Sequence, residues 1–135
     1  MRKILFKAKR IDNGEWVYGN YAFTDTNGEK HFIFQNKAFE FEVDKDTICQ
    51  YTGLTDKNGN KIWENDILEW EFANAPSDYY ECVWLEDECA FAFRHCKYTN
   101  HYENPVDCYD EDYTDGFYMK VIGNIFDNPE LLKGE

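Results

Sequence analysis

Three Asn-Gly dipeptides separate short aromatic segments of this chain, and they constrain its fold more than any other feature. They stand at Asn13-Gly14, Asn27-Gly28 and Asn58-Gly59. Asn and Gly adopt the positive φ angles of tight hairpin turns more readily than other residues, so each dipeptide predicts a turn between two antiparallel strands. The flanking segments are rich in aromatic and β-branched residues, as strands are. The sequence therefore predicts a mainly β protein.

The segments between the turns carry the two-residue period of half-buried strands. The clearest alternation places Leu68, Trp70 and Phe72 on one face and Glu69 and Glu71 on the other. Strands are predicted at residues 16–23, 31–34, 39–43, 68–72, 81–85, 89–93 and 117–122. Outside these strands, long loops are predicted over 73–116, because this stretch contains Pro76, an Asn-Pro pair and long acidic runs.

The C-terminal end has the signals of a short helix. Asn128 is a preferred N-cap residue, Pro129 fits the first helical position, Glu130 lies in the first turn, and Gly134 follows the last. We therefore predict a short C-terminal helix.

The net charge disfavours two classes of partner. Among 135 residues, 27 acids face 14 bases, a net charge of −13, which disfavours binding to nucleic-acid phosphates and to anionic membranes. Residues 1–10 hold five of the bases and no acid, whereas residues 62–93 hold nine acids and no base. Residues 102–118 hold six acids and again no base.

The acidic runs are interleaved with aromatic residues, which anchor many protein interfaces. Such a surface suits a basic protein groove, where carboxylates take the place of phosphates. The candidate partner-binding residues are Asp78, Tyr79, Tyr80, Glu86, Asp87, Glu88, Asp107, Tyr109, Asp110, Glu111, Asp112 and Tyr113.

Motifs that would indicate catalysis or a cofactor are missing from the sequence. It has no glycine-rich phosphate loop and no Gly-x-Ser-x-Gly elbow, and Ser77 is its only serine. Its five cysteines form no Cys-x-x-Cys pair, so zinc binding is disfavoured. The segment 56–60 and the acidic run 110–112 are read as a hairpin turn and a solvated loop in preference to cation sites. We expect neither an enzyme nor a cofactor, with a small metal- or thiol-dependent enzyme as an alternative.

No segment has the length and hydropathy of a signal peptide or a membrane span. The odd number of cysteines, five, also disfavours a disulfide-bonded secreted protein. The expected location is the cytoplasm of a bacterial host cell, without contact with a membrane.

Three segments resemble the signature of the YopX-like proteins of phages and prophages. Residues 50–68 are similar to that family's Q-Y-T-G-L-x-D-x-N-G-x-x-I-Y-E-G-D-I-V pattern, with Asn65 in place of the usual Gly. Residues 121–132 look like its V-I-G-N-I-x-x-N-P-E-L-L ending, and residues 6–19 are similar to its opening. Asn also tolerates a left-handed turn, so the geometry at residue 65 can be kept.

The resemblance implies a phage or prophage origin and a small SH3-like barrel with N-terminal β-hairpins, but no activity. It implies a single YopX-like domain over 1–135, with an N-terminal β region at 1–49 and barrel segments at 50–72 and 117–135. Between them lies a variable acidic insert at 73–116, which is longer and richer in Tyr and Cys than is typical of the family.

These observations lead to one main expectation of function. We expect a non-catalytic accessory protein that binds and modulates a host or defence protein with a basic surface, through an acidic surface that mimics DNA. A nucleic-acid-binding accessory protein is the alternative, based on the basic N-terminal decapeptide. Sheets with exposed edges also associate readily, so a homo-oligomer is a further possible state.

Overall fold

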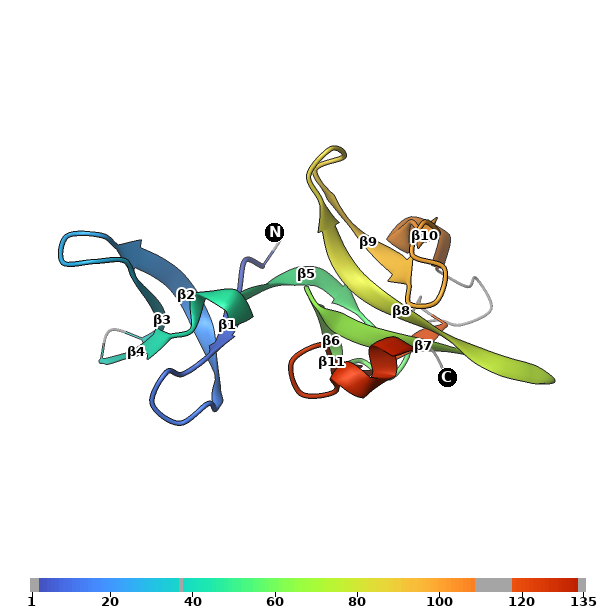
Figure 1. Cartoon of the computed structure of the whole chain (residues 1–135), viewed down its shortest axis with the longest axis horizontal. Coiled ribbons are helices and arrows are strands. Elements are labelled where there is room, and N and C mark those ends of the chain that lie inside the picture. The colour runs from blue at the N-terminus through green and yellow to red at the C-terminus, as the bar shows by residue number, and fades with distance from the viewer. Residues whose placement is uncertain (1–2, 37, 109–117, 134–135) are drawn as a thin grey trace. The chain divides into compact units, whose positions relative to one another are not determined.

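The computed structural model describes residues 3–36, 38–108 and 118–133, which fold mainly into antiparallel strands (Figure 1). The strands are β1 (Phe6–Lys9), β2 (Trp16–Thr24), β3 (Lys30–Asn36), β4 (Phe39–Val43), β5 (Cys49–Thr55), β6 (Lys61–Trp63), β7 (Asp66–Phe72), β8 (Ala75–Leu85), β9 (Ala90–His95), β10 (Tyr102–Glu103) and β11 (Met119–Asn124). The described residues also form three 3-10 turns, η1 (Lys45–Thr47) between β4 and β5, η2 (Pro105–Cys108) after β10, and η3 (Pro129–Lys133) after β11. Among the described residues, no helix has the length and apolar character needed to span a bilayer.

The chain divides into two compact units, Met1–Gly53 and Leu54–Glu135. In the first unit the strands lie in the order β4-β3-β2-β1-β5. Its core is formed by Ala8, Val17, Ile33 and Val43, all at most 6% exposed. The last residues of β5 belong to the second unit, where β6 follows β5 in the sheet order.

The second unit contains the sheet β10-β9-β8-β7-β11. One face of this sheet carries most of the buried side chains of the unit. They are Leu68 on β7, Tyr80 and Cys82 on β8, Phe93 on β9 and Met119 on β11, packed with Ile62 of β6 and Cys108 of η2. The register places Tyr80 opposite both Leu68 and His95, so this face is continuous across the central strands.

The structure confirms the mainly β prediction and its turns. Every predicted strand is present, most of them extended or shifted by one to a few residues. Gly14, Gly28 and Gly59 have φ angles of 73°, 92° and 83°, as the hairpin turns require. Asn65 has a φ of 72°, so the left-handed conformation is kept at this position.

The prediction of an SH3-like barrel is wrong, because the two sheets stay open in the part of the chain that the structure describes. A barrel needs a continuous ladder between its first and last strands. In the first unit, β1 and β4 approach each other only near their ends, through a bridge between Arg10 and Val43 and the neighbouring backbone hydrogen bonds. In the second unit, β10 and β11 are the two edges of the sheet.

The predicted C-terminal helix is also wrong, because Pro129–Lys133 forms a single 3-10 turn. The N–H of Leu131 donates to the carbonyl of Asn128, which is the i to i+3 bond of a 3-10 turn. The side chain of Asn128 accepts from the N–H of Asn124 and is not available as an N-cap. Five residues are also too few to offset the cost of helix nucleation.

The prediction of long loops over 73–116 is wrong for its first part, because β8 runs from Ala75 to Leu85 through Pro76. The register shifts between Trp70 and Phe72, so Pro76 lies at a bulge, where a strand tolerates proline. The division of the chain into 1–49, 50–72, 73–116 and 117–135 stays a prediction.

Candidate protein-binding site

The hairpin of β8 and β9 carries four of the acidic residues that the sequence predicts in a contact surface, Asp78, Glu86, Asp87 and Glu88. Its ladder pairs Trp84 with Phe91 and Leu85 with Ala90. The turn follows at residues 86–89, where the N–H of Cys89 donates to the carbonyl of Glu86. Glu86, Asp87 and Glu88 therefore project from one tight turn at the end of two long strands.

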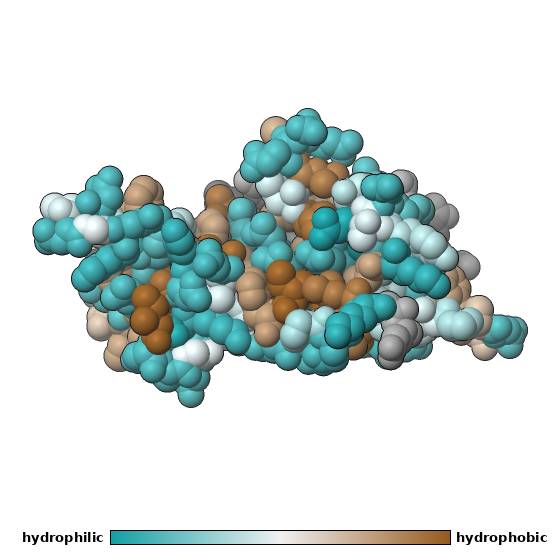
Figure 2. Space-filling view, viewed as in Figure 1, coloured by the Kyte–Doolittle hydropathy of each residue, from teal (hydrophilic) through white to brown (hydrophobic). Residues whose placement is uncertain are grey.

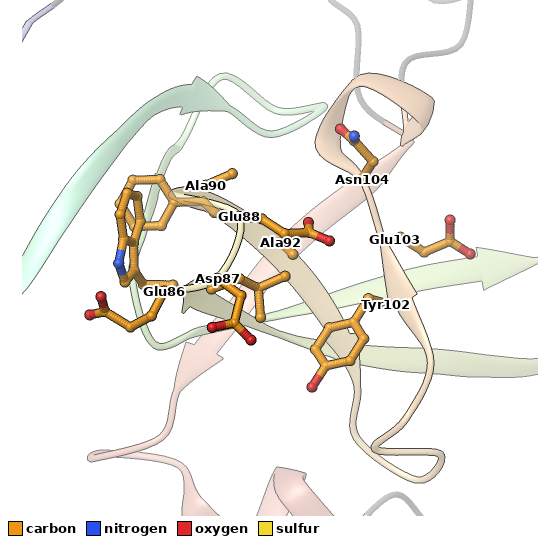
Figure 3. Close-up of a pocket in the computed structure, with 11 residues that line it drawn as sticks. Glu86, Asp87, Glu88, Ala90, Ala92, Tyr102, Glu103 and Asn104 are labelled. Atoms are coloured by element: carbon orange, nitrogen blue, oxygen red, sulfur yellow. The ribbon is translucent and has the colours of Figure 1, made fainter.

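A groove of about 550 Å³ lies between this turn and β10. Its apolar lining comes from the hairpin, and its acidic lining from both sides (Figure 3). The lining residues are Trp84, Leu85, Glu86, Asp87, Glu88, Ala90, Phe91, Ala92, Tyr102, Glu103 and Asn104. In Figure 2 the tip of the hairpin, uppermost in that view, is hydrophilic, and apolar side chains lie directly beneath it.

Most carboxylates on the strands of the same sheet are neutralised by cations or hydrogen bonds. Lys120 on β11 contacts both Glu69 and Glu71 of β7. Arg94 on β9 contacts Glu81 of β8 at 2.9 Å. These contacts lower the pKa of Glu71, chiefly through its hydrogen bond to Lys120, and raise the pKa of Arg94, chiefly through its hydrogen bond to Glu81.

The carboxylates of the hairpin turn differ from those of the strands. Within residues 3–36, 38–108 and 118–133, no cation pairs with Glu86, Asp87 or Glu88. The negative charge of the sheet is therefore concentrated at the hairpin tip.

Asp78 is part of the local structure around His95. The imidazole of His95 is 8% exposed, and its Nε2 lies 3.2 Å from Oδ1 of Asp78. Nδ1 accepts the backbone N–H groups of Lys97 and Tyr98 at 3.1 and 3.0 Å. Because Nδ1 accepts, the neutral ring carries its proton on Nε2 and donates it to Asp78. The Asp78 carboxylate thus helps to fix the end of β9.

The two tyrosines that follow Asp78 have different surroundings. Tyr79 donates its hydroxyl to Glu69 at 3.3 Å, on the face of the sheet opposite the core. Tyr80 is 2% exposed and lies in the core against Trp70 and His95. Burial raises the pKa of the Tyr80 hydroxyl far above its usual range. Tyr80 is therefore part of the core of the second unit, and its role in partner binding stays a prediction.

The remaining candidates belong to η2 and to the segment that follows it in the sequence. Asp107 is placed in η2. Tyr109, Asp110, Glu111, Asp112 and Tyr113 lie outside the described residues. The structure thus brings together the three acids of the hairpin turn and adds Tyr102 and Glu103, which were not among the candidates. Both belong to the aromatic and acidic run that begins at residue 102, but only the pairing of β10 with β9 places them beside the hairpin.

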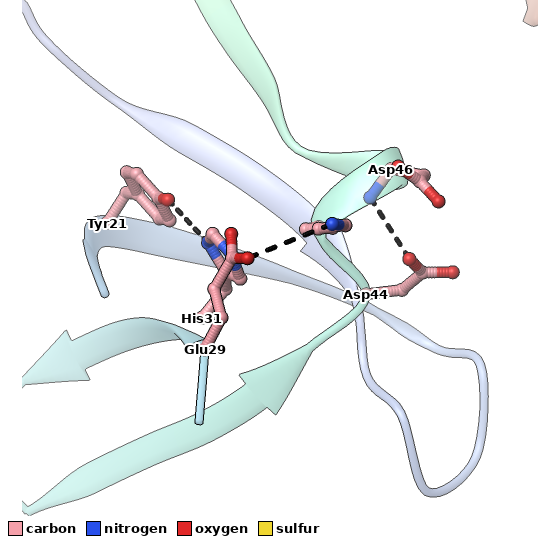
Figure 4. A network of polar contacts seen from close by, with 6 residues as sticks. Tyr21, Glu29, His31, Asp44 and Asp46 are labelled. Atoms are coloured by element: carbon pink, nitrogen blue, oxygen red, sulfur yellow. Dashed lines mark hydrogen bonds and ion pairs between the residues drawn. The ribbon is translucent and has the colours of Figure 1, made fainter. Parts of the chain in front are cut away.

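Geometry does not favour thiol catalysis. Both ring nitrogens of His95 are engaged, as described above. Burial raises the pKa of the Cys96 thiol to about 11, so little thiolate is present at neutral pH. In the first unit, His31 lies between the hydroxyl of Tyr21 at 2.5 Å and a carboxylate oxygen of Glu29 at 2.7 Å (Figure 4). Among the described residues, no three His, Cys, Asp or Glu side chains are grouped as metal ligands.

The basic N-terminal segment packs against aromatic rings. Lys7 and Lys9 lie 4.4 and 5.4 Å from the centre of the Trp16 ring, and Arg10 lies 4.5 Å from that of Phe41. These are cation–π contacts. They occupy three of the five bases that sequence analysis offered for contact with a nucleic acid.

Cysteine exposure leads to a prediction about the hairpin tip. Cys89 is the only exposed cysteine of the five, and its φ of 50° places it in the turn. We expect one thiol to react rapidly with a maleimide at neutral pH and the other four to react slowly. Peptide mapping by mass spectrometry should find the label on Cys89, and the C89S variant should lose the fast phase. A fast phase retained in C89S would show that another thiol, and not Cys89, is the accessible one.

Comparison with known proteins agrees with the resemblance seen in the sequence. The chain is similar over 98% of its length to EF1440 from Enterococcus faecalis, a protein of known crystal structure. The match covers 99% of that protein with 26% identity and a TM-score of 0.57. No curated protein matches the chain. Residues 5–133 match the family described as YopX protein, so this chain belongs to the YopX family.

Proposed function

We propose that this chain is a non-catalytic accessory protein that binds a host or defence protein through the tip of its β8–β9 hairpin and the adjoining groove. One observation carries the proposal: Glu86, Asp87 and Glu88 have no neutralising cation among the described residues, whereas Glu69, Glu71 and Glu81 of the same sheet do.

Carboxylates without a cation partner repel one another on a protrusion, and this repulsion lowers the stability of the folded state. A basic partner would offset the repulsion when it binds. The partner proposed is a protein with a basic surface, such as a nucleic-acid enzyme, on which the carboxylates take the place of phosphates. The net charge of −13 would also accelerate encounter with such a partner. Binding would then modulate the partner by covering its basic surface.

A capture experiment with matched charge variants tests this function. Tagged protein is incubated with bacterial lysate, eluted with rising salt, and bound proteins are identified by mass spectrometry. In the tip variant, Glu86→Gln, Asp87→Asn and Glu88→Gln are combined. In the control variant, Asp25→Asn, Glu40→Gln and Glu42→Gln remove the same charge from exposed positions of the first unit.

The expected result is a basic protein that binds the wild type and the control variant and elutes as salt rises. Its capture by the tip variant should fall about tenfold or more, which corresponds to the loss of about 1.4 kcal/mol. Equal capture by the tip and control variants would contradict the proposed surface. Light scattering of each bait reports separately whether the chain associates with itself.

A further inference from the structure

We propose that the groove between the hairpin turn and β10 binds an arginine side chain of the basic partner. This inference rests on the proposed function and specifies the chemistry that the groove recognises. The groove presents three features to such a side chain: an apolar floor, two carboxylates and an aromatic wall.

The floor of the groove is apolar. Leu85 and Ala90 are directly opposite each other in the β8–β9 ladder, and Ala92 lies two residues further along β9 on the same face. Alanine side chains leave open space above a strand, and two of the three residues of this strip are alanines. This strip suits the three methylene groups of an arginine stem, which bury favourably against an apolar surface.

Two carboxylates border this strip on the side of the turn. In Figure 3, Asp87 and Glu88 extend from the turn on the side that faces β10, whereas Glu86 points away. Both line the groove, and neither has a cation partner among the described residues. Two acceptors at the end of an apolar strip match a guanidinium, which donates in several directions within one plane.

The opposite wall of the groove is Tyr102, which is 44% exposed. An exposed tyrosine ring attracts a cation that lies over its face, and the planar guanidinium also stacks on it. Arg94, opposite Tyr102 in the β9–β10 ladder, hydrogen-bonds to the Tyr102 side chain and is paired with Glu81 at 2.9 Å, so its charge is already balanced. The groove thus keeps a negative character, although an arginine lies on the neighbouring strand.

Arginine is favoured over lysine by the same features. A lysine ammonium is compact and strongly hydrated, and it gains little from a stacking surface. A groove with carboxylates alone would bind both residues by charge. The aromatic wall and the apolar strip make the difference, and the volume of about 550 Å³ lies in the range of small-ligand pockets.

The test uses two fluorescein-labelled peptides of equal length and charge, one with four arginines and one with four lysines in a Gly-Ser background. Fluorescence anisotropy measures binding of each peptide to the full chain at low and moderate salt. We expect the arginine peptide to bind about fivefold more tightly, the size of one cation–π contact at a partly exposed site.

Three variants locate the effect. Tyr102→Leu should remove the arginine preference, whereas Tyr102→Phe, which keeps the ring, should retain it. Asp87→Asn combined with Glu88→Gln should weaken both peptides about tenfold, and Glu40→Gln combined with Glu42→Gln should change neither. Circular dichroism of each variant checks that its β structure is intact.

The outcomes separate this inference from the function on which it rests. Equal binding of the two peptides, or an arginine preference that survives Tyr102→Leu, overturns the arginine site. If capture of a basic protein is still lost in the tip variant, the proposed function stands without it. If the arginine preference depends on Tyr102 but protein capture ignores the tip, the groove is an arginine site and the proposed function fails.

Discussion

Replacement of Asp56 with alanine is expected to lower the free energy of unfolding by about 3–4 kcal/mol, through the loss of a buried and fully bonded carboxylate. Asp56 is 0% exposed. Its Oδ1 accepts the backbone N–H groups of Asn58 at 2.9 Å and Asn60 at 2.8 Å. Its Oδ2 accepts the N–H of Val121, 65 residues away, at 2.9 Å. One side chain thus joins the β5–β6 turn to β11.

The matched variant Asp56→Asn separates hydrogen bonding from loss of volume. Asparagine has nearly the same shape, but its amide has one acceptor oxygen and one NH₂ group. In one orientation the NH₂ group faces the turn, and the N–H groups of Asn58 and Asn60 lose their acceptor. In the other orientation the NH₂ group faces β11, and the N–H of Val121 loses its acceptor. We expect a loss of about 2–3 kcal/mol for this variant and almost none for Asp46→Asn, which removes an exposed carboxylate of η1.

Urea unfolding followed by tryptophan fluorescence measures these losses, and hydrogen exchange locates them. Amides of β6 and β11 should exchange faster in Asp56→Asn, because the bond between the turn and β11 is lost. A variant within about 0.5 kcal/mol of the wild type would mean that Asp56 does not hold these segments together.

The hydrogen bonds of Asp56 show which parts of the fold can be predicted from the sequence and which cannot. Asn58-Gly59 predicted the turn, and the preference for a hairpin over a calcium loop at 56–60 is supported, because the carboxylate of Asp56 accepts backbone N–H groups. The bond to Val121 could not be predicted, because it depends on which strand lies beside the turn after folding. A turn is specified by neighbouring residues in the sequence, whereas the hydrogen-bond partner of a buried group can come from a distant segment.

The candidate site, too, could be predicted only in part from the sequence. Residues 62–93 contain nine acids and no base, but these acids do not form one continuous negative surface in the folded protein. Lys120 and Arg94 lie beyond its end in the sequence and neutralise part of it in the folded sheet. The period of two that relates Leu68 and Trp70 also applies along β8, where the pairing of Tyr80 with Leu68 places Tyr80 on the buried face. Whether a sheet closes depends on edge pairing, which no local pattern specifies.

The second large effect is expected at Gly19, where a methyl group would meet the backbone of β3. A Cβ at this position would overlap the carbonyl oxygen of Phe34 and lie 2.8 Å from its carbonyl carbon. Both atoms belong to the main chain, so no side-chain rotation relieves the contact. β2 pairs with β1 as far as Gly19 and with β3 from Asn20 onward. Glycine thus allows the close approach at the point where β2 changes partner.

Gly19→Ala is therefore expected to lower the free energy of unfolding by about 3 kcal/mol, at the upper end of overpacking effects. Alanine also restricts the unfolded chain, which would stabilise the folded state by only about 0.4–1 kcal/mol. The steric strain is larger, so the net effect of the substitution is destabilising. A unit of the size of Met1–Gly53 has roughly 3–8 kcal/mol of stability, so the change is a large share of it.

Hydrogen exchange on the intact protein is the measurement that distinguishes local strain from a general loss of stability. In Gly19→Ala the amides of β1, β2 and β3 should lose protection, whereas Asn20→Ala, at the next and exposed position, should keep it. A variant with unchanged protection in β2 and β3 would show that the two strands separate at little cost. The close approach at Gly19 would then not be needed for the first unit to fold.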